Sequence, residues 1–431
     1  VGELEATQFS TTTKLKGVAT FVIGANSFGG DAKQGAADYV FGTNAYDQAA
    51  NLEGFDVVLT GLIMSSFYAG FVGGSLFAPA VVNRVGHIRT FSAFASLASA
   101  AALCHAVIVE PITWMIFRAI TGVCFAALCL VAESWLNERS TNLNRGALLS
   151  TYFVVILGAT ALGQMLLPVA PIGGYDLFVT VSVIISVALV PVALTSTPTP
   201  VEIEHERLGL KRLYTVSPVG FIGCLGAGLT SGALWALGAV FAEKIGLMTE
   251  ETAIFVATMI IGGLLTQWPL GKLSDYIDRR YVIVTISFGM VGVGLFFIEP
   301  SHLEGKWLYA LGAIAGGLAL PIYGLSIAHT NDFMETKDFV PASATLLMVY
   351  GVGATLGPFL ATIFMLVMGP SGLFIYSAII CSTIGIFALY RISQRNPVPE
   401  DEAENFAMVP RTSQIAFELD PRSDEFEREH D

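Results

Sequence analysis

Charged residues are scarce in this chain. Asp, Glu, Lys and Arg make up only 13% of its 431 residues, hydrophobic residues make up 54%, and the mean hydropathy is +0.66. Soluble domains carry about 25% charged residues, and an apolar excess of this size would leave large exposed patches on such a domain. The composition therefore excludes an ordinary soluble protein and predicts a protein that lies in a lipid bilayer.

The motifs of soluble catalysis are also missing. The chain has no P-loop and no Gly-x-Ser-x-Gly, His-Glu-x-x-His or Cys-x-x-Cys sequence. Its five cysteines fall inside apolar runs without metal-ligand spacing, so we expect reduced core thiols. We expect no enzymatic activity, cofactor, bound metal or nucleic-acid partner, and the lack of a nucleotide site argues against ATP-driven pumping.

Long apolar runs, by contrast, are abundant. A helix needs about 20 apolar residues to cross the hydrocarbon, and runs without alternation favour helices over a membrane barrel. One further segment, 15–38, is apolar only as far as Gly30 and then carries Asp31 and Lys33. The clear candidate spans lie near 55–81, 88–108, 111–136, 145–168, 173–195, 217–242, 250–273, 280–298, 305–327, 339–367 and 370–392.

Basic residues gather in the loops of one side. If both termini are cytoplasmic, the outside loops keep little more than Lys33, Lys244 and Lys306. Cytoplasmic loops of membrane proteins carry such an excess of Lys and Arg. Two cytoplasmic ends require an even number of spans, so the segment 15–38 must also cross the bilayer.

A short polar loop, 271–280, separates two of the apolar segments. Gly271 lets two helix ends approach closely, and Asp275 lies at a helix terminus within reach of Arg279 and Arg280. We expect an ion pair of Asp275 in this loop. We expect it to stabilise the conformation of the protein that is open to the outside.

The same pattern occurs about 192 residues earlier, in the loop 82–89. There Arg84 and Gly86 are present, but Asn83 takes the place of the acid, so this loop cannot form the same ion pair. Two copies at half-chain spacing indicate an internal repeat, which is typical of transporters built from two related bundles.

The 271–280 loop resembles the loop signature of the major facilitator superfamily, Gly-x-x-x-Asp-Arg-x-Gly-Arg-Arg, with Tyr276 and Asp278 as departures from it. Arg118 and Gly122 resemble the family's fourth-helix Arg-x-x-x-Gly motif, which the family links to proton coupling. The resemblance also extends to a branch of uncharacterised bacterial facilitators, through the sequences Glu-Ser-Trp-Leu-Asn at 133–137 and Gln-Trp-Pro at 267–269.

This resemblance implies an all-α membrane protein with twelve transmembrane helices in two pseudo-symmetric six-helix bundles. We expect the bundles at 15–195 and 217–392, joined by a cytoplasmic loop at 196–216. A cytoplasmic segment, 1–14, precedes them. An acidic cytoplasmic tail, 393–431, follows, and we expect it to be solvated.

Three charged residues in apolar surroundings are candidates for ion coupling. Arg118, Glu133 and Asp31 lie in or beside predicted helices, where a charge costs several kcal/mol unless it faces water or a partner. Glu133 could instead form a structural ion pair with Arg139 or Arg145. Asp31 could instead lie in an enlarged outside loop.

A further set of residues is polar or amphipathic and lies on apolar segments. Each could face a substrate cavity, and each could equally be a core or interface residue. These candidates are Gln164, Trp235, Gln267, Trp268, Tyr323 and His329.

Our main hypothesis is a secondary transporter in a bacterial inner membrane that moves a small solute by alternating access, with protons as the candidate coupling ion. The alternative is a facilitator-like subunit or assembly factor that no longer transports. Such a subunit would contact another membrane protein through the polar stretch 31–54.

Overall fold

The computed structural model describes residues 57–108, 110–140, 145–166, 168, 176–194, 208–299, 305–396, 406–408 and 410–418. Within these ranges the regular structure is helical, and eleven helical segments are long and apolar enough to cross a membrane. An all-helical membrane fold was predicted and is confirmed. The predicted first span, 15–38, with Asp31, and the polar stretch 31–54 lie outside the described residues.

The first half contains five described helices: α3 (Val57–Val85), α4 (His87–Val107), α5 (Pro111–Arg139), α6 (Arg145–Met165) and α7 (Asp176–Ala193). The short α8 (Leu210–Val216) precedes the second half, whose helices are α9 (Pro218–Lys244), α10 (Thr249–Tyr276), α11 (Arg279–Phe296), α12 (Lys306–Ala319), α13 (Pro321–Asn331), α14 (Phe339–Met368) and α15 (Gly372–Ile392). Two 3₁₀ turns, η3 (Thr336–Asp338) and η4 (Ile415–Phe417), complete the order. The predicted ends agree to about one helical turn.

One predicted span is interrupted. The segment 305–327 forms two helices, α12 and α13, that meet at Leu320 because Pro321 starts the second one. Proline has no N–H, so it cannot donate to the carbonyl four residues earlier. That carbonyl, Gly317 O, accepts a hydrogen bond from the Thr266 hydroxyl of α10 at 2.7 Å instead. The break is thus fixed by a contact between helices.

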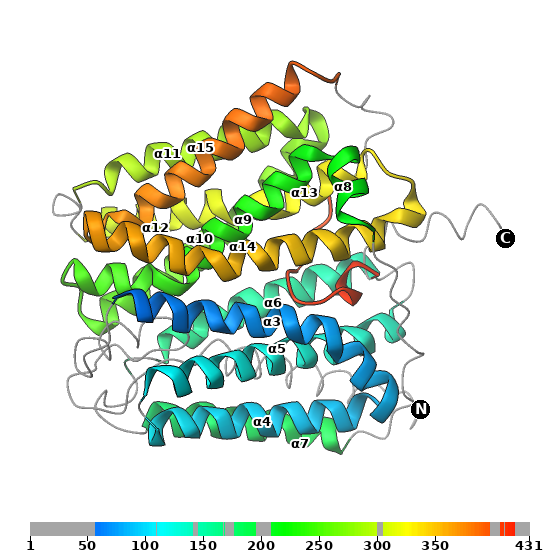
Figure 1. Ribbon diagram of the computed structural model, residues 1–431, viewed down its shortest axis with the longest axis vertical. Coiled ribbons are helices and arrows are strands. Elements are labelled where there is room, and N and C mark those ends of the chain that lie inside the picture. Colours follow the sequence, from blue (N-terminus) through cyan, green and yellow to red (C-terminus); the bar gives the residue numbers. More distant parts are fainter. Residues whose placement is uncertain are drawn as a thin grey trace.

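The two halves meet along two helix pairs. Figure 1 shows α3 to α7 in the lower half of the molecule and α9 to α15 in the upper half. Across the boundary α3 packs against α14, and α6 packs against α10. At the end where α3 begins, a Cβ added to Gly61 would lie 2.4 Å from the Thr362 hydroxyl and 3.3 Å from the Phe359 Cα. The halves are therefore in direct contact at that end.

The structure corrects one expectation about the acidic tail. Residues 406–408 and 410–418, which we call the tail segment, lie between the two halves (Figure 1, red). Its turn η4 contacts α5 and α14, and Ile415, Ala416 and Phe417 are almost fully buried. The reason is local composition, since this stretch is apolar between two acidic blocks, and burial removes its apolar side chains from water.

Candidate functional site

A cavity of about 170 Å³ lies between the two halves. Its walls come from α3, α5, α6, α9, α10 and α14, together with Leu320 and residues 410–412 of the tail segment. Most of the lining is apolar or aromatic. The polar and charged members are Tyr68, Arg118, Thr160, Gln164, Trp235, Tyr350, Arg411 and Thr412.

Arg118 places a positive charge in the first-half wall. The residue is 3% exposed, and its guanidinium lies 5.1 Å from the centre of the Phe67 ring on α3. Its Nη2 also lies 4.0 Å from the Met64 sulfur. Cations interact favourably with aromatic faces at such distances, so α3 supplies part of the surroundings of this charge.

Gln164 and Trp235, both predicted cavity candidates, do line the cavity. Gln164 lies on α6 and is only 4% exposed, and within the described part of the chain its Oε1 atom accepts no hydrogen bond. A buried acceptor without a donor is unfavourable by about 1–3 kcal/mol. This atom can therefore accept a hydrogen bond from a ligand.

Glu133 is completely buried on α5. The Tyr152 hydroxyl of α6 donates to its Oε1 at 2.7 Å. Two hydroxyls of the tail segment also donate to this carboxylate, Thr412 to Oε1 and Ser413 to Oε2. Arg145, one of the predicted alternative partners of Glu133, donates to Ser140 Oγ at 3.2 Å. Glu133 thus connects the first half to the tail segment.

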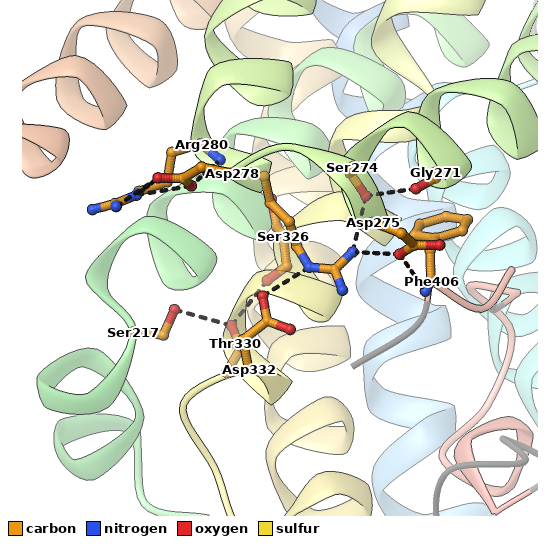
Figure 2. A network of polar contacts seen from close by, with 11 residues as sticks. Ser217, Gly271, Ser274, Asp275, Asp278, Arg280, Ser326, Thr330, Asp332 and Phe406 are labelled. Carbon is orange, nitrogen blue, oxygen red and sulfur yellow. Dashed lines mark hydrogen bonds and ion pairs between the residues drawn. The ribbon is translucent and has the colours of Figure 1, made fainter. Parts of the chain in front are cut away.

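The 271–280 loop forms a buried ion network (Figure 2). Asp275 accepts from Arg279 Nη1 at 3.3 Å, as the spacing predicted. The same guanidinium bonds Asp332 at the end of α13 at 2.7 Å and Ser274 at 2.9 Å. Because one cation joins two carboxylates from different helices, it fixes α10 against α13.

Arg280, the other predicted alternative partner of Asp275, pairs with Asp278. It binds both carboxylate oxygens of Asp278, with contacts of 2.6 and 3.0 Å. Burial opposes ionisation of Asp278, but the hydrogen bonds from Arg280 outweigh it and keep the pKa of Asp278 below its ordinary value. Arg280 also donates to the Arg395 carbonyl at 2.8 Å, which ties the loop to the end of α15.

The corresponding loop in the first half, 82–89, is exposed to solvent at Arg84. Arg84 is exposed, whereas Arg279 and Arg280 are 3% and 2% exposed. Gly86 precedes α4 with a φ of 89°, a left-handed conformation that favours glycine. This loop therefore forms a tight turn at the surface.

The tail segment begins on the 271–280 loop. The Phe406 backbone N–H donates to Asp275 Oδ1 at 2.7 Å (Figure 2). Its ring covers Gly271, where an added Cβ would lie 2.1 Å from the ring atom Cδ1. On the other side, a Cβ added to Gly324 of α13 would lie 3.3 Å from the same ring. Two glycines therefore make the space that Phe406 fills.

Arg411 is the next anchor of the tail segment, and it reaches the second-half wall. Its guanidinium carbon lies 5.1 Å from the centre of the Tyr323 ring and 5.2 Å from that of Tyr350. It donates to the Ser231 hydroxyl at 3.3 Å and to the Leu320 carbonyl at the helix break. We call these four groups the cation cage. Tyr323, a predicted cavity candidate, is fully buried and is not among the residues that line the cavity. Tyr350, Ser231 and Arg411 were not predicted.

The tail segment also contacts the far end of α5. The Asn137 side chain donates to Glu418 at 2.8 Å. Burial raises the pKa of Glu418 to about 7, against a smaller opposing effect of the Arg145 charge. The tail segment thus touches both halves, through Asp275 and the cation cage on one side and through Glu133 and Asn137 on the other.

The remaining predicted candidates lie away from the cavity lining. Trp268 is 62% exposed on the outer surface of the described helices. Gln267 is buried on α10, and a Cβ added to Gly324 would lie 2.9 Å from its Nε2. His329 is buried near the end of α13, with its ring 5.1 Å from that of Phe333.

Comparisons with known proteins agree with this architecture. The family model described as Major Facilitator Superfamily matches residues 34–311 and 216–419. The chain is 28% identical over 354 residues to the uncharacterized MFS-type transporter YcaD of Salmonella newport (strain SL254), covering 81% of this chain and 90% of that one. It is 26% identical over 341 residues to an uncharacterized MFS-type transporter of Enterobacter sp. (strain 638), covering 79% and 88%.

Two solved structures share the fold at low sequence identity. The nucleoside transporter NupG superposes with a TM-score of 0.66 at 12% identity, over 89% of this chain and 98% of that one. A bacterial homolog of the human lysosomal transporter Spinster, in an inward-facing and occupied conformation, gives 0.66 at 13% identity, over 93% and 98%.

Proposed function

Because the chain belongs to the Major Facilitator Superfamily, we propose that it is a secondary transporter that moves a small solute through the central cavity by alternating access. Membership of this family supports membrane transport of some solute. The bacterial relatives and the excess of basic residues in loops on one side support a bacterial inner membrane, with both termini in the cytoplasm.

The observation that carries the proposal is the position of the cavity. It lies between two halves that meet along α3–α14 and α6–α10, and its apolar walls contain Arg118 and Gln164. Ionisable groups within a membrane usually mark a solute or ion pathway. A solute bound there would contact both halves, so a rocking motion of one half against the other would change its access.

The contact at Gly61 defines the state of this cavity. There α3 and α14 touch at the end remote from the 271–280 loop, and the tail segment lies at the opposite end. We propose that this state faces the cytoplasm. Export or import then requires the Gly61 contact to open while the halves close at the loop end.

The 271–280 loop has a supporting role in this proposal. The Asp275–Arg279–Asp332 network holds α10 against α13 within the second half. We propose that it keeps the end of this half rigid as the halves move, and that Asp275 contacts the first half in the alternate, outward-facing state.

Proton coupling is proposed to use Glu133. Its carboxylate is held by hydroxyl groups of Tyr152, Thr412 and Ser413, which can donate to the charged form and accept from the protonated form. Departure of the tail hydroxyls would expose this carboxylate to the cytoplasmic side. A carboxylate whose surroundings change with conformation can load and release a proton.

Transport can be tested with the full chain in proteoliposomes. A panel of labelled solutes is presented with and without a pH gradient, and we expect gradient-driven uptake of at least one. Glu133→Gln should reduce that uptake at least tenfold. Glu110→Gln is the matched control, because Glu110 accepts from the Thr113 N–H at the N-terminus of α5, far along that helix from Glu133.

Two results would contradict the parts of this proposal separately. Uptake that is unaffected when the pH gradient is collapsed would exclude proton coupling but leave transport intact. Absence of uptake for every solute, together with purification of the chain in a stoichiometric complex, would favour the subunit hypothesis.

A further inference from the structure

The cation cage is built from aromatic ring faces and oxygen atoms, which attract a positive charge. Its members are two tyrosine rings, the Ser231 hydroxyl and one main-chain carbonyl, from α9, α13, α14 and the α12–α13 break. Arg411 also donates to the Tyr350 hydroxyl at 3.4 Å. Tyr323 is fully buried and Tyr350 is 7% exposed. Aromatic faces bind cations more strongly when water is excluded. These four groups therefore suit a planar or compact organic cation.

Arg411 shows how such a cation is held. Its guanidinium lies about equally far from both rings while its N–H groups point at oxygen acceptors. The residue belongs to a segment that enters from the end of the chain, whereas the cage belongs to the helices of the second half. Arg411 therefore occupies the cage as a ligand would.

The rest of the cavity fits the remainder of such a ligand. The first-half walls of the same cavity carry Phe71 and Phe125, which suit an apolar or aromatic body, while the Phe67 ring faces the Arg118 guanidinium. Gln164 offers the acceptor described above. Thr412, which is adjacent to Arg411, reaches Glu133. Glu133 itself is not among the residues that line the cavity.

We infer that the cavity binds small organic cations with a guanidinium or amine head and an apolar body, and that Arg411 of the tail segment competes with them for the cage. The inference rests on the proposed function only in identifying this ligand with the transported solute. Binding and competition follow from the geometry of the cage itself.

The tail segment limits access to the cage through several contacts at once. Phe406 is held by Asp275 and Gly271, and Thr412 and Ser413 are held by Glu133. A cation that takes the cage must displace Arg411 from it. A bound cation and the Arg411 side chain therefore cannot occupy the cage at the same time.

The test uses the purified full chain and benzylguanidine as the probe, with benzylurea as a neutral control of similar shape. Binding is followed by calorimetry. Benzylguanidine should bind Arg411→Ala at least tenfold more tightly than it binds the unmodified protein. Arg411→Lys, which keeps a cation in the tail segment, should resemble the unmodified protein. Benzylurea should bind all three proteins with similarly low affinity.

A second pair of variants tests the cage directly in the Arg411→Ala background. Tyr350→Leu removes one ring and should weaken benzylguanidine binding about tenfold, whereas Tyr350→Phe keeps the ring and should retain it. Thermal unfolding of each variant without the probe establishes that it folds. Equal binding of benzylguanidine and benzylurea, or equal affinity of the unmodified protein and Arg411→Ala, would overturn the inference.

The outcome is separable from that of the proposed function, because no gradient or vesicle is used. If benzylguanidine binds as expected but no solute of the panel is taken up by proteoliposomes, the cage stands and the transport proposal fails. If uptake of another solute occurs but the cage does not bind benzylguanidine, the transport proposal stands and this inference fails.

Discussion

The loops 82–89 and 271–280 occupy corresponding places in the two halves, yet among the described residues only the second forms an ion network. The first has Asn83 and an exposed Arg84, and the second has Asp275 with a buried Arg279. The acid in the second loop does more than pair with a cation, since Asp275 also accepts from the Phe406 N–H. The difference shows that one copy of a repeated loop can bind another part of the chain while the other copy does not.

The glycines of the two loops, Gly86 and Gly271, also have different roles. Gly86 serves the backbone, because its φ of 89° lies in the left-handed region. Gly271 is inside a helix and serves the tail segment, because only a residue without Cβ leaves room for the Phe406 ring. One glycine is therefore required for a turn, and the other for a contact between distant parts of the chain.

Removing the buried cation should have the largest effect. Arg279→Gln removes the buried cation that Asp275 and Asp332 share, while Lys272 stays 3.6 Å from Asp275. Removing one partner of a buried ion pair costs up to about 3–5 kcal/mol of unfolding free energy. Arg84→Gln, in the exposed loop, should change stability by no more than about 0.5 kcal/mol. Denaturant unfolding in detergent, followed by tryptophan fluorescence, measures both. Equal losses for the two variants would contradict the contrast between the loops.

A methyl group on the second glycine should release the tail segment. Gly271→Ala places a Cβ about where the Phe406 ring lies, so the ring must leave. In a background without native cysteines, the thiol of Ala416→Cys reports docking, because Ala416 is fully buried in the docked segment. Its maleimide labelling should accelerate at least tenfold in Gly271→Ala.

The matched variant for this measurement is Gly86→Ala. It strains a left-handed residue by about 1–2 kcal/mol, yet it should leave labelling of the Ala416→Cys thiol unchanged. Labelling that speeds up equally in both variants would mean that general loosening, rather than the Phe406 contact, controls docking.

The smallest expected effect is a pH dependence of tail docking. It tests the Glu418 contact with the first half separately from the contacts with the second half. Glu418 has its pKa raised to about 7 when docked, from an ordinary value of 4.5. The docked state therefore binds the proton more tightly, so docking is favoured at low pH and weakens as pH rises from about 4.5 to 7. Labelling of the Ala416→Cys thiol should be severalfold faster at about pH 6.5 than at about pH 5.5.

Glu418→Gln provides the control for this pH effect. It keeps an oxygen that can accept from Asn137 and removes the titrating group. The comparison is made in a Glu133→Gln background, because Glu133 also contacts the tail segment. There the labelling rate of Glu418→Gln should lose this pH dependence once the intrinsic reactivity of the thiol is corrected with a free cysteine standard. A dependence that persists in this variant would assign the effect to another group.

Most of the fold could be predicted from the sequence because membrane spans are set by the thickness of the hydrocarbon, and apolar runs of sufficient length are visible residue by residue. The ion pair of Asp275 with Arg279 could also be predicted, since it is local in sequence. The break at Leu320 was missed, although Pro321 inside the span 305–327 was a visible signal.

The tail segment shows why the rest of the site could not be predicted. Its acidic flanks dominate the composition after Asn396, so an average over the tail predicts solvation, while Phe406, Ile415 and Phe417 mark an apolar stretch within it. Contacts such as Arg411 with Tyr350 join residues 61 positions apart. No local pattern specifies such pairs, because they depend on the assembled helices.

Because the tail segment belongs to the same chain as the cage, it determines how much ligand is needed to displace Arg411. Residues 397–405 join Asn396, beyond the end of α15, to Phe406 along the chain. A group on the same chain binds intramolecularly, so its effective concentration does not depend on the concentration of the protein. Dilution therefore does not vacate the cage. In every molecule a soluble cation competes with the same effective concentration of Arg411. The cation displaces Arg411 only if its own concentration is high enough or if it binds the cage more tightly.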